Sequence, residues 1–298
     1  MNKAPVVIAH RGASGYLPEH TFPAKALAHG MGADFLEQDV VASRDGRLIV
    51  FHDLFLDQLT DVAQRYPGRA RPDGRSYCID FSLAEIRTLR VTERRGKDGI
   101  AARYPGRFPA GTGSFRIHTL EEELEFIRGL NRSTGRQAGV YAEIKDPDWH
   151  HQHDVPLGDR VVGTLRDFGY RARDDGFFVQ CFSASELQRV RTAYGADLPL
   201  VQLLEEGADV RRPALSAIAG YANAIGPAIS LAWPDRGLVG MAHELGLLVH
   251  PYTFRADALP PGFKNFAELV STFVEGLGVD GLFTDFPDLV VQQARTTT

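Results

Sequence analysis

Short apolar runs recur along the chain, each bounded by polar or glycine-rich residues, and this is the pattern of buried β-strands. Most of the runs are separated by stretches whose apolar residues recur at helical spacing. Strand and helix patterns that alternate along a whole chain predict a parallel sheet with crossover helices. The strand-like runs are residues 6–9, 34–40, 47–51, 139–144, 176–182, 198–204, 223–227, 245–252 and 281–286, and the helix-like stretches include 21–31, 119–130, 159–170, 183–195 and 239–246.

The length of 298 residues selects among the parallel α/β folds. It favours one domain, residues 1–298, built as a TIM-type (β/α)8 barrel, and no glycine-rich dinucleotide fingerprint of a doubly wound sheet follows the first strand. Nine strand candidates compete for the eight places of such a barrel, and 223–227 is the weakest candidate. The turn at 44–47 is too short to hold a crossover helix, so we expect an irregular barrel around the second and third strands.

Residues 53–118 interrupt the alternation and are rich in Arg, Pro, Gly and Asp. A loop of this length inside a compact domain is usually functional or has structure of its own. Within it, residues 81–90 predict a helix in which Ser82 is the N-cap and Glu85 completes a capping box. We interpret the segment as an insertion after the third strand that lies over the mouth of the barrel, with a disordered loop as the alternative.

Composition narrows the choice of partner. The formal net charge of −5 argues against general affinity for nucleic acid or for anionic membranes. No run of 18 apolar residues is present, so we expect no membrane insertion. The two cysteines, Cys78 and Cys181, fit free thiols better than a disulfide framework. The chain starts without a signal peptide, which predicts a cytoplasmic protein if the sequence is complete as given.

Polar side chains follow the apolar runs of the first four strands. His10 and Arg11 end the first strand, and Glu37 and Asp39 share one face of the second because strand side chains alternate. In a barrel the carboxyl ends of the strands meet at one face, where such folds place their active sites. Gly12 lets the backbone turn sharply at that face. The other polar strand ends are His52 with Asp53 on the third strand and Glu143 with Lys145 on the fourth.

Three of these residues are carboxylates, namely Glu37, Asp39 and Glu143. They would repel one another in a low-dielectric site unless a cation compensates their charge. Oxygen ligands suit a hard cation, Ca²⁺ or Mg²⁺, rather than zinc. The pattern therefore predicts that the three bind one divalent cation. Surface carboxylates, or ion pairs with Arg11 and Lys145, are the alternative.

His10 and His52 end neighbouring strands beside these carboxylates. Two imidazoles that titrate near neutrality suit a general acid and a general base. Arg11 and Lys145 add fixed positive charge suited to a phosphoryl group. No Gly-x-Ser-x-Gly elbow and no cysteine-based constellation is present. The combination predicts hydrolytic phosphoryl transfer without a protein nucleophile.

The motifs that contain these residues resemble the glycerophosphodiester phosphodiesterase family, a branch of the phospholipase C-like phosphodiesterases with a TIM barrel. The resemblance spans residues 6 to 288, and the segments RYPGRFP and TLEEELEFIRGLN resemble the periplasmic, calcium-dependent bacterial form. The matching stretches are HRGASGYLPEHT, GADFLEQDV, LIVFHD, YAEIK, VQCFSASEL, LVHPYTFR and GLFTDFPD.

The resemblance implies an activity and a role for each matching residue. It implies hydrolysis of a small glycerophosphodiester to sn-glycerol 3-phosphate and an alcohol such as choline or ethanolamine, with Ca²⁺ as the cation and Mg²⁺ as the alternative. It also implies a periplasmic location if a signal peptide was removed, and we expect a monomer or homodimer. By position, His10 and His52 match acid/base histidines, Glu37, Asp39 and Glu143 match metal ligands, Arg11 and Lys145 match phosphate contacts, and Glu19 matches a position that we assign to the substrate side.

Other features carry two interpretations each. The segment 149–154, which includes His150, His151 and His153, forms either a second metal site or a substrate-side loop. Phe182 either lines a glycerol pocket or belongs to the core. His250 and Tyr252 share a face of a late strand and either fill the barrel or face its mouth. Four more histidines show no convincing chemical partner in the sequence: His20, His29, His118 and His243.

Two other functions compete with this assignment. A phosphoinositide- or sphingomyelin-type lipase would need a surface that engages membranes, and no basic amphipathic or aromatic-rich stretch is evident. A barrel that only holds a metal and a phosphodiester headgroup would not need the proton-transfer pair His10 and His52.

Overall fold

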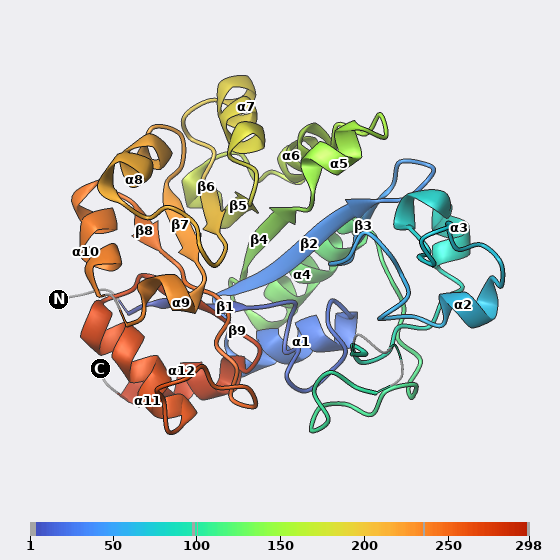
Figure 1. Ribbon diagram of the computed structural model, residues 1–298, viewed down its shortest axis with the longest axis horizontal. Helices are drawn as coiled ribbons and strands as arrows, with labels where there is room; N and C mark the ends of the chain where they lie inside the picture. Colours follow the sequence, from blue (N-terminus) through green and yellow to red (C-terminus); the bar gives the residue numbers. More distant parts are fainter. Residues whose placement is uncertain (1–3, 97–98, 100, 235, 297–298) are drawn as a thin grey trace.

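The computed structural model of the protein describes residues 4–96, 99, 101–234 and 236–296. Its centre is a ring of eight parallel strands in the order β9-β1-β2-β4-β5-β6-β7-β8 (Figure 1). Backbone hydrogen bonds from Asp280 N to Val249 O (3.0 Å) and from Phe283 N to Pro251 O (3.0 Å) close the ring between its two ends. The predicted TIM-type barrel is therefore confirmed. The ring strands are β1 (Val6–Ala9), β2 (Phe35–Ala42), β4 (Gly139–Ile144), β5 (Phe177–Cys181), β6 (Leu200–Leu204), β7 (Ala224–Pro227), β8 (Leu248–Val249) and β9 (Gly281–Thr284).

The ninth strand, β3 (Leu48–Val50), lies outside the ring and pairs antiparallel with β2 through a short turn. The expected irregularity at the second and third strands is confirmed. Our ranking of 223–227 as the weakest strand was wrong, because these residues form β7 and occupy a place in the ring. Its glycine has a packing reason, since a Cβ on Gly226 would lie 2.6 Å from the Leu203 side chain.

Helices surround the ring (Figure 1), and each helix-like stretch of the sequence overlaps one of them. The longest, α4, begins at a capping box between Thr119 and Glu122 and ends at Gly135 in the left-handed conformation. The helices are α1 (Phe22–Met31), α2 (Val62–Arg65), α3 (Leu83–Ile86), α4 (Leu120–Thr134), α5 (Pro147–His151), α6 (Leu157–Asp167), α7 (Ala184–Tyr194), α8 (Arg212–Ala219), α9 (Ile229–Ala232), α10 (Gly237–Glu244), α11 (Phe266–Ser271) and α12 (Pro287–Thr296), with short helical turns η1 (Cys78–Asp80), η2 (Arg173–Asp175) and η3 (Thr272–Leu277).

The described residues of the insertion, defined as residues 53–118, include α2, η1 and α3 beside β3 (Figure 1). They form a hydrophobic cluster with the outer side of the β2–β3 hairpin, in which Phe81 and Ile86 are fully buried. The capping box of Ser82 and Glu85 is present as predicted. The helix that it begins is shorter than 81–90, because Val91 already forms bridges to two other segments of the insertion.

The inside of the ring is packed with side chains. Tyr141, Phe178 and Phe283 belong to the cluster that fills it. His250 is buried there, with its Nδ1 2.9 Å from the Tyr141 hydroxyl, so this histidine fills the barrel. A larger cluster lies between the ring and the surrounding helices. Both cysteines are free and buried, as expected.

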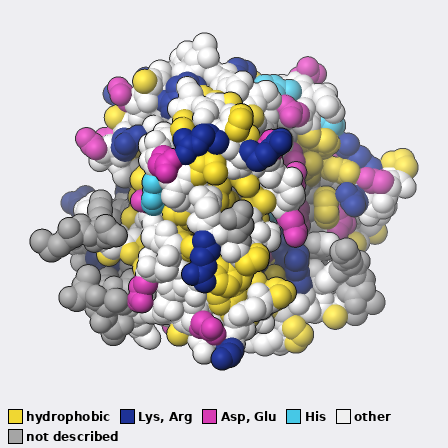
Figure 2. All heavy atoms as spheres, turned by 60° about the vertical axis from the view of Figure 1, so that its left-hand side comes forward, with side chains coloured by type: hydrophobic (Ala, Val, Ile, Leu, Met, Phe, Trp, Pro, Cys, Tyr) yellow, Lys and Arg dark blue, Asp and Glu magenta, His cyan; other side chains and the backbone are white. Residues whose placement is uncertain are grey.

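Within the described ranges, no helix is long and apolar enough to cross a bilayer. On the face turned forward in Figure 2, Lys and Arg side chains are scattered among acidic and apolar ones. The described residues of that face therefore form no continuous basic area.

Candidate active site

A cavity of about 250 Å³ opens at the carboxyl ends of the barrel strands. Its walls combine basic, acidic and aromatic side chains from most of the ring. Most of the site residues predicted from the sequence line it, and Asp39 and Glu19 lie behind Arg11. The lining residues are His10, Arg11, Glu37, His52, Glu143, Lys145, Gln180, Phe182, Leu203, Tyr252, Thr253, Arg255 and Phe283.

A strained turn directly after β1 orients the first of the side chains that line the cavity. Arg11 has a φ of 59° and Gly12 a φ of 86°, and the left-handed conformation is uncommon for arginine. The Arg11 amide donates to Glu37 Oε2 at 2.7 Å, which anchors the turn to β2. A Cβ on Gly12 would lie 2.8 Å from the Ala24 carbonyl carbon, so only glycine fits this approach to α1.

The three predicted metal-binding carboxylates come together at the mouth. Asp39 and Glu143 are register partners on β2 and β4, and Glu37 lies two residues before Asp39 on the same strand. Burial raises the pKa of Glu143 to about 8, and the charge of Asp39 adds to the increase. Burial and Asp39 likewise raise the pKa of Glu37 well above its usual range. Burial alone would raise the pKa of Asp39, but Lys145, His52, Arg11 and the hydrogen bond from His20 together outweigh it and hold that pKa well below its usual range.

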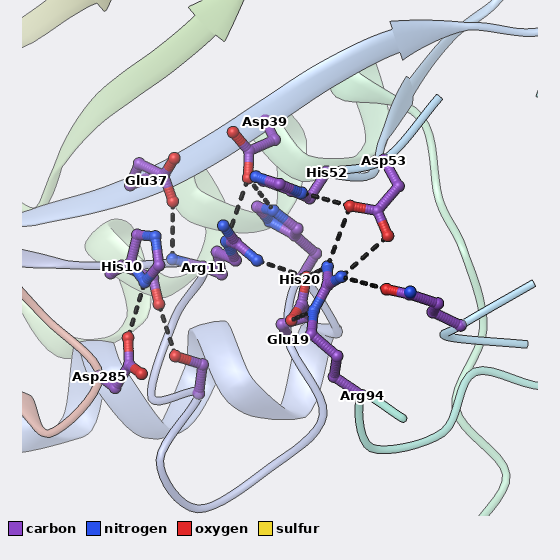
Figure 3. Close-up of polar contacts among 12 residues, drawn as sticks. His10, Arg11, Glu19, His20, Glu37, Asp39, His52, Asp53, Arg94 and Asp285 are labelled. Atoms are coloured by element: carbon purple, nitrogen blue, oxygen red, sulfur yellow. Dashed lines mark hydrogen bonds and ion pairs between the residues drawn. The ribbon is translucent and has the colours of Figure 1, made fainter. Parts of the chain in front are cut away.

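His20 joins this group, although its sequence context gave it no partner. Its Nε2 lies 2.8 Å from Asp39 Oδ2, and potential ligand atoms of His20, Glu37 and Asp39 all lie within 4.8 Å of one another (Figure 3). Asp39 Oδ1 is buried and has no hydrogen-bond partner. Glu143 lies beside Asp39 but accepts a hydrogen bond from Lys145 Nζ at 2.6 Å. These residues offer a cation mainly oxygen ligands, together with one imidazole.

The two histidines of the cavity share one arrangement. His10 Nδ1 lies 2.6 Å from Asp285 Oδ1, and His52 Nδ1 lies 2.5 Å from Asp53 Oδ1 (Figure 3). Because each carboxylate accepts from Nδ1, the nitrogen left for proton exchange is Nε2 in both rings. Burial, and next the charge of Arg11, lower the pKa of His10 to about 4 and that of His52 to about 3. Both rings are therefore neutral near pH 7 in the free protein.

The cationic side chains are held by carboxylates. Arg11 donates from Nη1 to Glu19 at 2.9 Å, and its Nε lies 3.3 Å from Asp39 Oδ2. Glu19 also accepts from Arg94 of the insertion, at 2.7 and 2.9 Å. Glu19 thus contacts two arginines and does not line the cavity, which differs from the substrate-side position that we assigned to it.

The sequence assigned no role to several residues of this network. Asp53 was named only as a polar strand end beside His52, and Asp285 is the last-but-one residue of the final strand-like run, where the same rule could have found it. Arg94 and Arg107 lie in the insertion, where no periodic pattern predicts which side chains turn inward. The last member is Arg255, whose Nε donates to Asp285 Oδ2 at 2.9 Å.

The aromatic side chains resolve two open alternatives. Phe182 is 42% exposed and lines the cavity, so it does not belong to the core. Tyr252 lines the cavity too, whereas His250 lies deeper in the barrel. The rings of Phe182 and Tyr252 meet edge to face with centroids 6.0 Å apart. They give the cavity one apolar wall.

The segment 149–154 lies beside this wall. A second cavity, of about 420 Å³, is lined by Trp149 of this segment and shares Phe182 and Lys145 with the first. His150 accepts from the Ala42 amide, and its Nδ1 lies 3.0 Å from the Asp146 carbonyl. Across the described ranges, the only group of side chains close enough to hold a metal is the one that includes His20. This position supports the substrate-side loop over the second metal site.

The remaining histidines also have partners, contrary to our expectation. In the folded chain each of them contacts a residue that is distant in sequence or lies in the next helix. The spacing of residues along the sequence could not predict these contacts. The pairs are His29 with Asn131, His118 with Glu123 and His243 with Asp280.

Known proteins resemble this chain in sequence over most of its length. A family model, the glycerophosphoryl diester phosphodiesterase family, matches residues 10–289. The glycerophosphodiester phosphodiesterase of Haemophilus influenzae is 41% identical over 98% of this chain and 90% of its own length. That of Treponema pallidum is 36% identical over 96% and 91%.

Solved structures share the fold. A Silicibacter pomeroyi protein, provisionally assigned as a glycerophosphoryl diester phosphodiesterase, superimposes with a TM-score of 0.77 at 27% identity and covers 99% of this chain and 95% of its own. An Oleispira antarctica phosphodiesterase, solved in complex with the product sn-glycerol-3-phosphate, gives a TM-score of 0.71 at 20% identity over 98% and 97%.

Proposed function

The chain belongs to the glycerophosphoryl diester phosphodiesterase family, and from this premise we propose that it hydrolyses glycerophosphodiesters to sn-glycerol 3-phosphate and an alcohol. Glycerophosphocholine and glycerophosphoethanolamine are the proposed substrates. The observation that carries the proposal is the cavity in which two neutral histidines, two cations and a cluster of carboxylates face one another. The product complex of the Oleispira antarctica protein, which shares the fold, supports the same glycerol phosphate end of the substrate.

A divalent cation belongs to this proposal, with Ca²⁺ as the first choice and Mg²⁺ as the alternative. The residues fit such an ion, because Asp39 Oδ1 is buried without a hydrogen-bond partner, with Lys145 Nζ 3.8 Å away, and the pKa values of Glu37 and Glu143 are raised. We propose Glu37, Asp39 and Glu143 as its ligands, with His20 orienting Asp39 or binding beside it. When bound, the cation would neutralise charge on the phosphate oxygens.

The proposed roles of the cationic residues follow from their position. Lys145 and Arg11 line the cavity and carry fixed charges, so they are placed to bind the phosphate oxygens. Glu19 holds the Arg11 guanidinium from behind, which limits its rotation. The substrate's negative charge stabilises a protonated imidazole, so it favours one charged histidine in the complex.

The histidines are the proposed general base and general acid. One Nε2 removes the proton of the attacking oxygen, either of water or of the neighbouring glycerol hydroxyl, and the other protonates the leaving alcohol. Asp285 and Asp53 keep the Nδ1 protons in place during both transfers. Phe182 and Tyr252 offer their apolar wall to the glycerol carbons, and the second cavity beside Trp149 accommodates the leaving alcohol.

The test is release of sn-glycerol 3-phosphate from glycerophosphocholine, measured in chelator and then with Ca²⁺ or Mg²⁺ added. We expect chelator to abolish release and one cation to restore it. His10→Ala and His52→Ala should each lower kcat by about 10²–10⁴-fold. Wild-type rates in both variants would overturn the roles of the histidines, and release that ignores chelator would overturn the cation.

A further inference from the structure

We propose that the insertion positions both histidines of the cavity, each through one buried arginine: Arg94 holds Asp53 against His52, and Arg107 holds Asp285 against His10. The inference rests on the proposed function and adds residues to it. Both arginines act through a carboxylate, so they are positioning residues that do not touch the substrate.

The first contact chain runs from Arg94 to His52. Arg94 Nη1 donates to Asp53 Oδ2 at 2.8 Å, and Nη2 lies 3.3 Å from Asp53 Oδ1 (Figure 3). Asp53 Oδ1 is also the partner of His52 Nδ1. Within the described ranges, Arg94 is the only arginine or lysine paired with Asp53. Through Glu19 the same guanidinium also supports Arg11.

The second contact chain runs from Arg107 to His10. Arg107 Nη2 donates to Asp285 Oδ2 at 2.7 Å, while Asp285 Oδ1 is the partner of His10 Nδ1. The Arg107 guanidinium also bonds both oxygens of Asp257 and the Ser14 carbonyl, which fixes its plane. Asp285 receives a further bond from Arg255. We therefore expect loss of Arg107 to have a smaller effect than loss of Arg94.

Both arginines are buried, which makes their contacts with carboxylates energetically important. The Arg94 and Arg107 side chains are only 7% and 5% exposed, whereas most arginines of the chain reach solvent. Burying a guanidinium is costly unless carboxylates compensate it, and here the compensating carboxylates include those beside the histidines, together with Glu19 and Asp257. The arginines keep these carboxylates ionised while the imidazoles are neutral, so each ring holds its Nδ1 proton and presents Nε2 to the cavity.

The test compares Arg94→Ala and Arg107→Ala with Arg69→Ala. Arg69 is the control, because it bonds Glu85 and the Asp80 carbonyl within the insertion, at 3.0 and 2.9 Å, and does not line the cavity. We expect kcat on glycerophosphocholine to fall about 10–100-fold in Arg94→Ala, less in Arg107→Ala and not at all in Arg69→Ala, with a smaller change in KM. Arg94→Lys, which keeps the charge, should recover part of the loss.

Double variants separate positioning from general damage to the fold. Arg94→Ala combined with Asp53→Asn should lose little more than the worse single variant, because both break one contact chain. Arg94→Ala combined with Asp285→Asn should lose the product of the two single effects. Multiplicative losses in both combinations would contradict the proposed contact chains.

A readout without substrate makes the inference independent of the reaction. Imidazole ¹⁵N spectra should show the Nδ1-protonated form of both histidines in the wild type. Arg94→Ala should shift only His52 toward the other tautomer, and Arg107→Ala only His10. Tautomers and kcat that are unchanged in both variants would overturn the inference. If the tautomers respond while the wild type hydrolyses no diester with any cation, the positioning stands and the proposed function fails.

Discussion

Gly12 makes the tightest backbone contact of the cavity turn, and its φ of 86° excludes a strain-free side chain. We expect Gly12→Ala to lower the free energy of unfolding by more than about 1 kcal/mol, because both the conformation and the contact with Ala24 oppose a Cβ. Gly163 in α6 has open space around it, so Gly163→Ala should instead stabilise the protein by about 0.5–1 kcal/mol. Urea unfolding of both variants measures the contrast, and equal stabilities would contradict it.

His250 makes the stability depend on pH. Burial lowers its pKa to about 4, so the ring stays neutral in the folded barrel while the unfolded chain takes up a proton below pH 6.5. The unfolded state then binds more protons, and stability falls as the pH drops from 6.5 to 4. The shift corresponds to about 3 kcal/mol.

The check is urea unfolding of the wild type and His250→Gln between pH 7 and pH 4. The wild type should lose up to about 3 kcal/mol more than the variant over this range. Parallel curves for the two proteins would show that His250 does not carry the dependence.

At the scale of single residues, the sequence was sufficient to find the polar side chains at the ends of strands. His10, Glu37 and Glu143 lie at the cavity because parallel strands point their carboxyl ends the same way, and the alternation of strands and helices along the chain is enough to predict this. Arg94 could not be found, because its inward direction depends on how an irregular segment packs. The roles of all these residues in the reaction stay predictions.

At the scale of elements, β3 and β7 show where patterns mislead. The run 47–51 has the stronger apolar sequence, yet it forms a hairpin strand outside the ring. Ile49 is buried in the insertion's cluster, whereas Leu48 and Val50 are buried in the cluster between the ring and the helices. The run 223–227 is short and contains glycine and proline, yet it forms a buried strand of the ring. The glycine fits because the Leu203 side chain leaves no room for a Cβ at position 226. Apolar character predicts that a run is buried and leaves open which core buries it.

The loop around α5 yields a prediction on the leaving alcohol. Trp149 lines the second cavity together with the exposed Asp146 and Asp148, and its ring stacks on Tyr77 of the insertion. An aromatic face near carboxylates attracts a quaternary ammonium by about 0.5–2 kcal/mol. Trp149→Ala should therefore lower kcat/KM for glycerophosphocholine by about 2–30-fold.

Glycerophosphoglycerol is the matched control substrate, because its alcohol is uncharged. Its kcat/KM should change less in Trp149→Ala than that of glycerophosphocholine. An equal loss for both diesters would place the choline group elsewhere.

At the scale of the whole molecule, the carboxylate cluster joins β2 to β4, so an ion bound there would stabilise the complete barrel. A cation at 100 times its dissociation constant adds about 2.7 kcal/mol to the free energy of unfolding. We expect chelator to lower the melting temperature by several degrees and Ca²⁺ to restore it.

Two variants check this linkage. Asp39→Asn should remove the response to cation, whereas Glu205→Gln, which changes an exposed carboxylate after β6, should keep it. A response that persists in Asp39→Asn would place the ion at another site.

The two junctions of the insertion lie next to each other, since the Val50 amide donates to the His118 carbonyl at 3.0 Å and Ile49 bridges to Thr119. The strand ring can therefore form before the insertion has built its own core, because segments with separate cores tend to fold as units. The two buried arginines would be among the last contacts to form. During refolding, the circular dichroism signal of the helices should recover earlier than enzymatic turnover. The delay between these two signals should be shorter when refolding starts from a state in which the insertion is already folded.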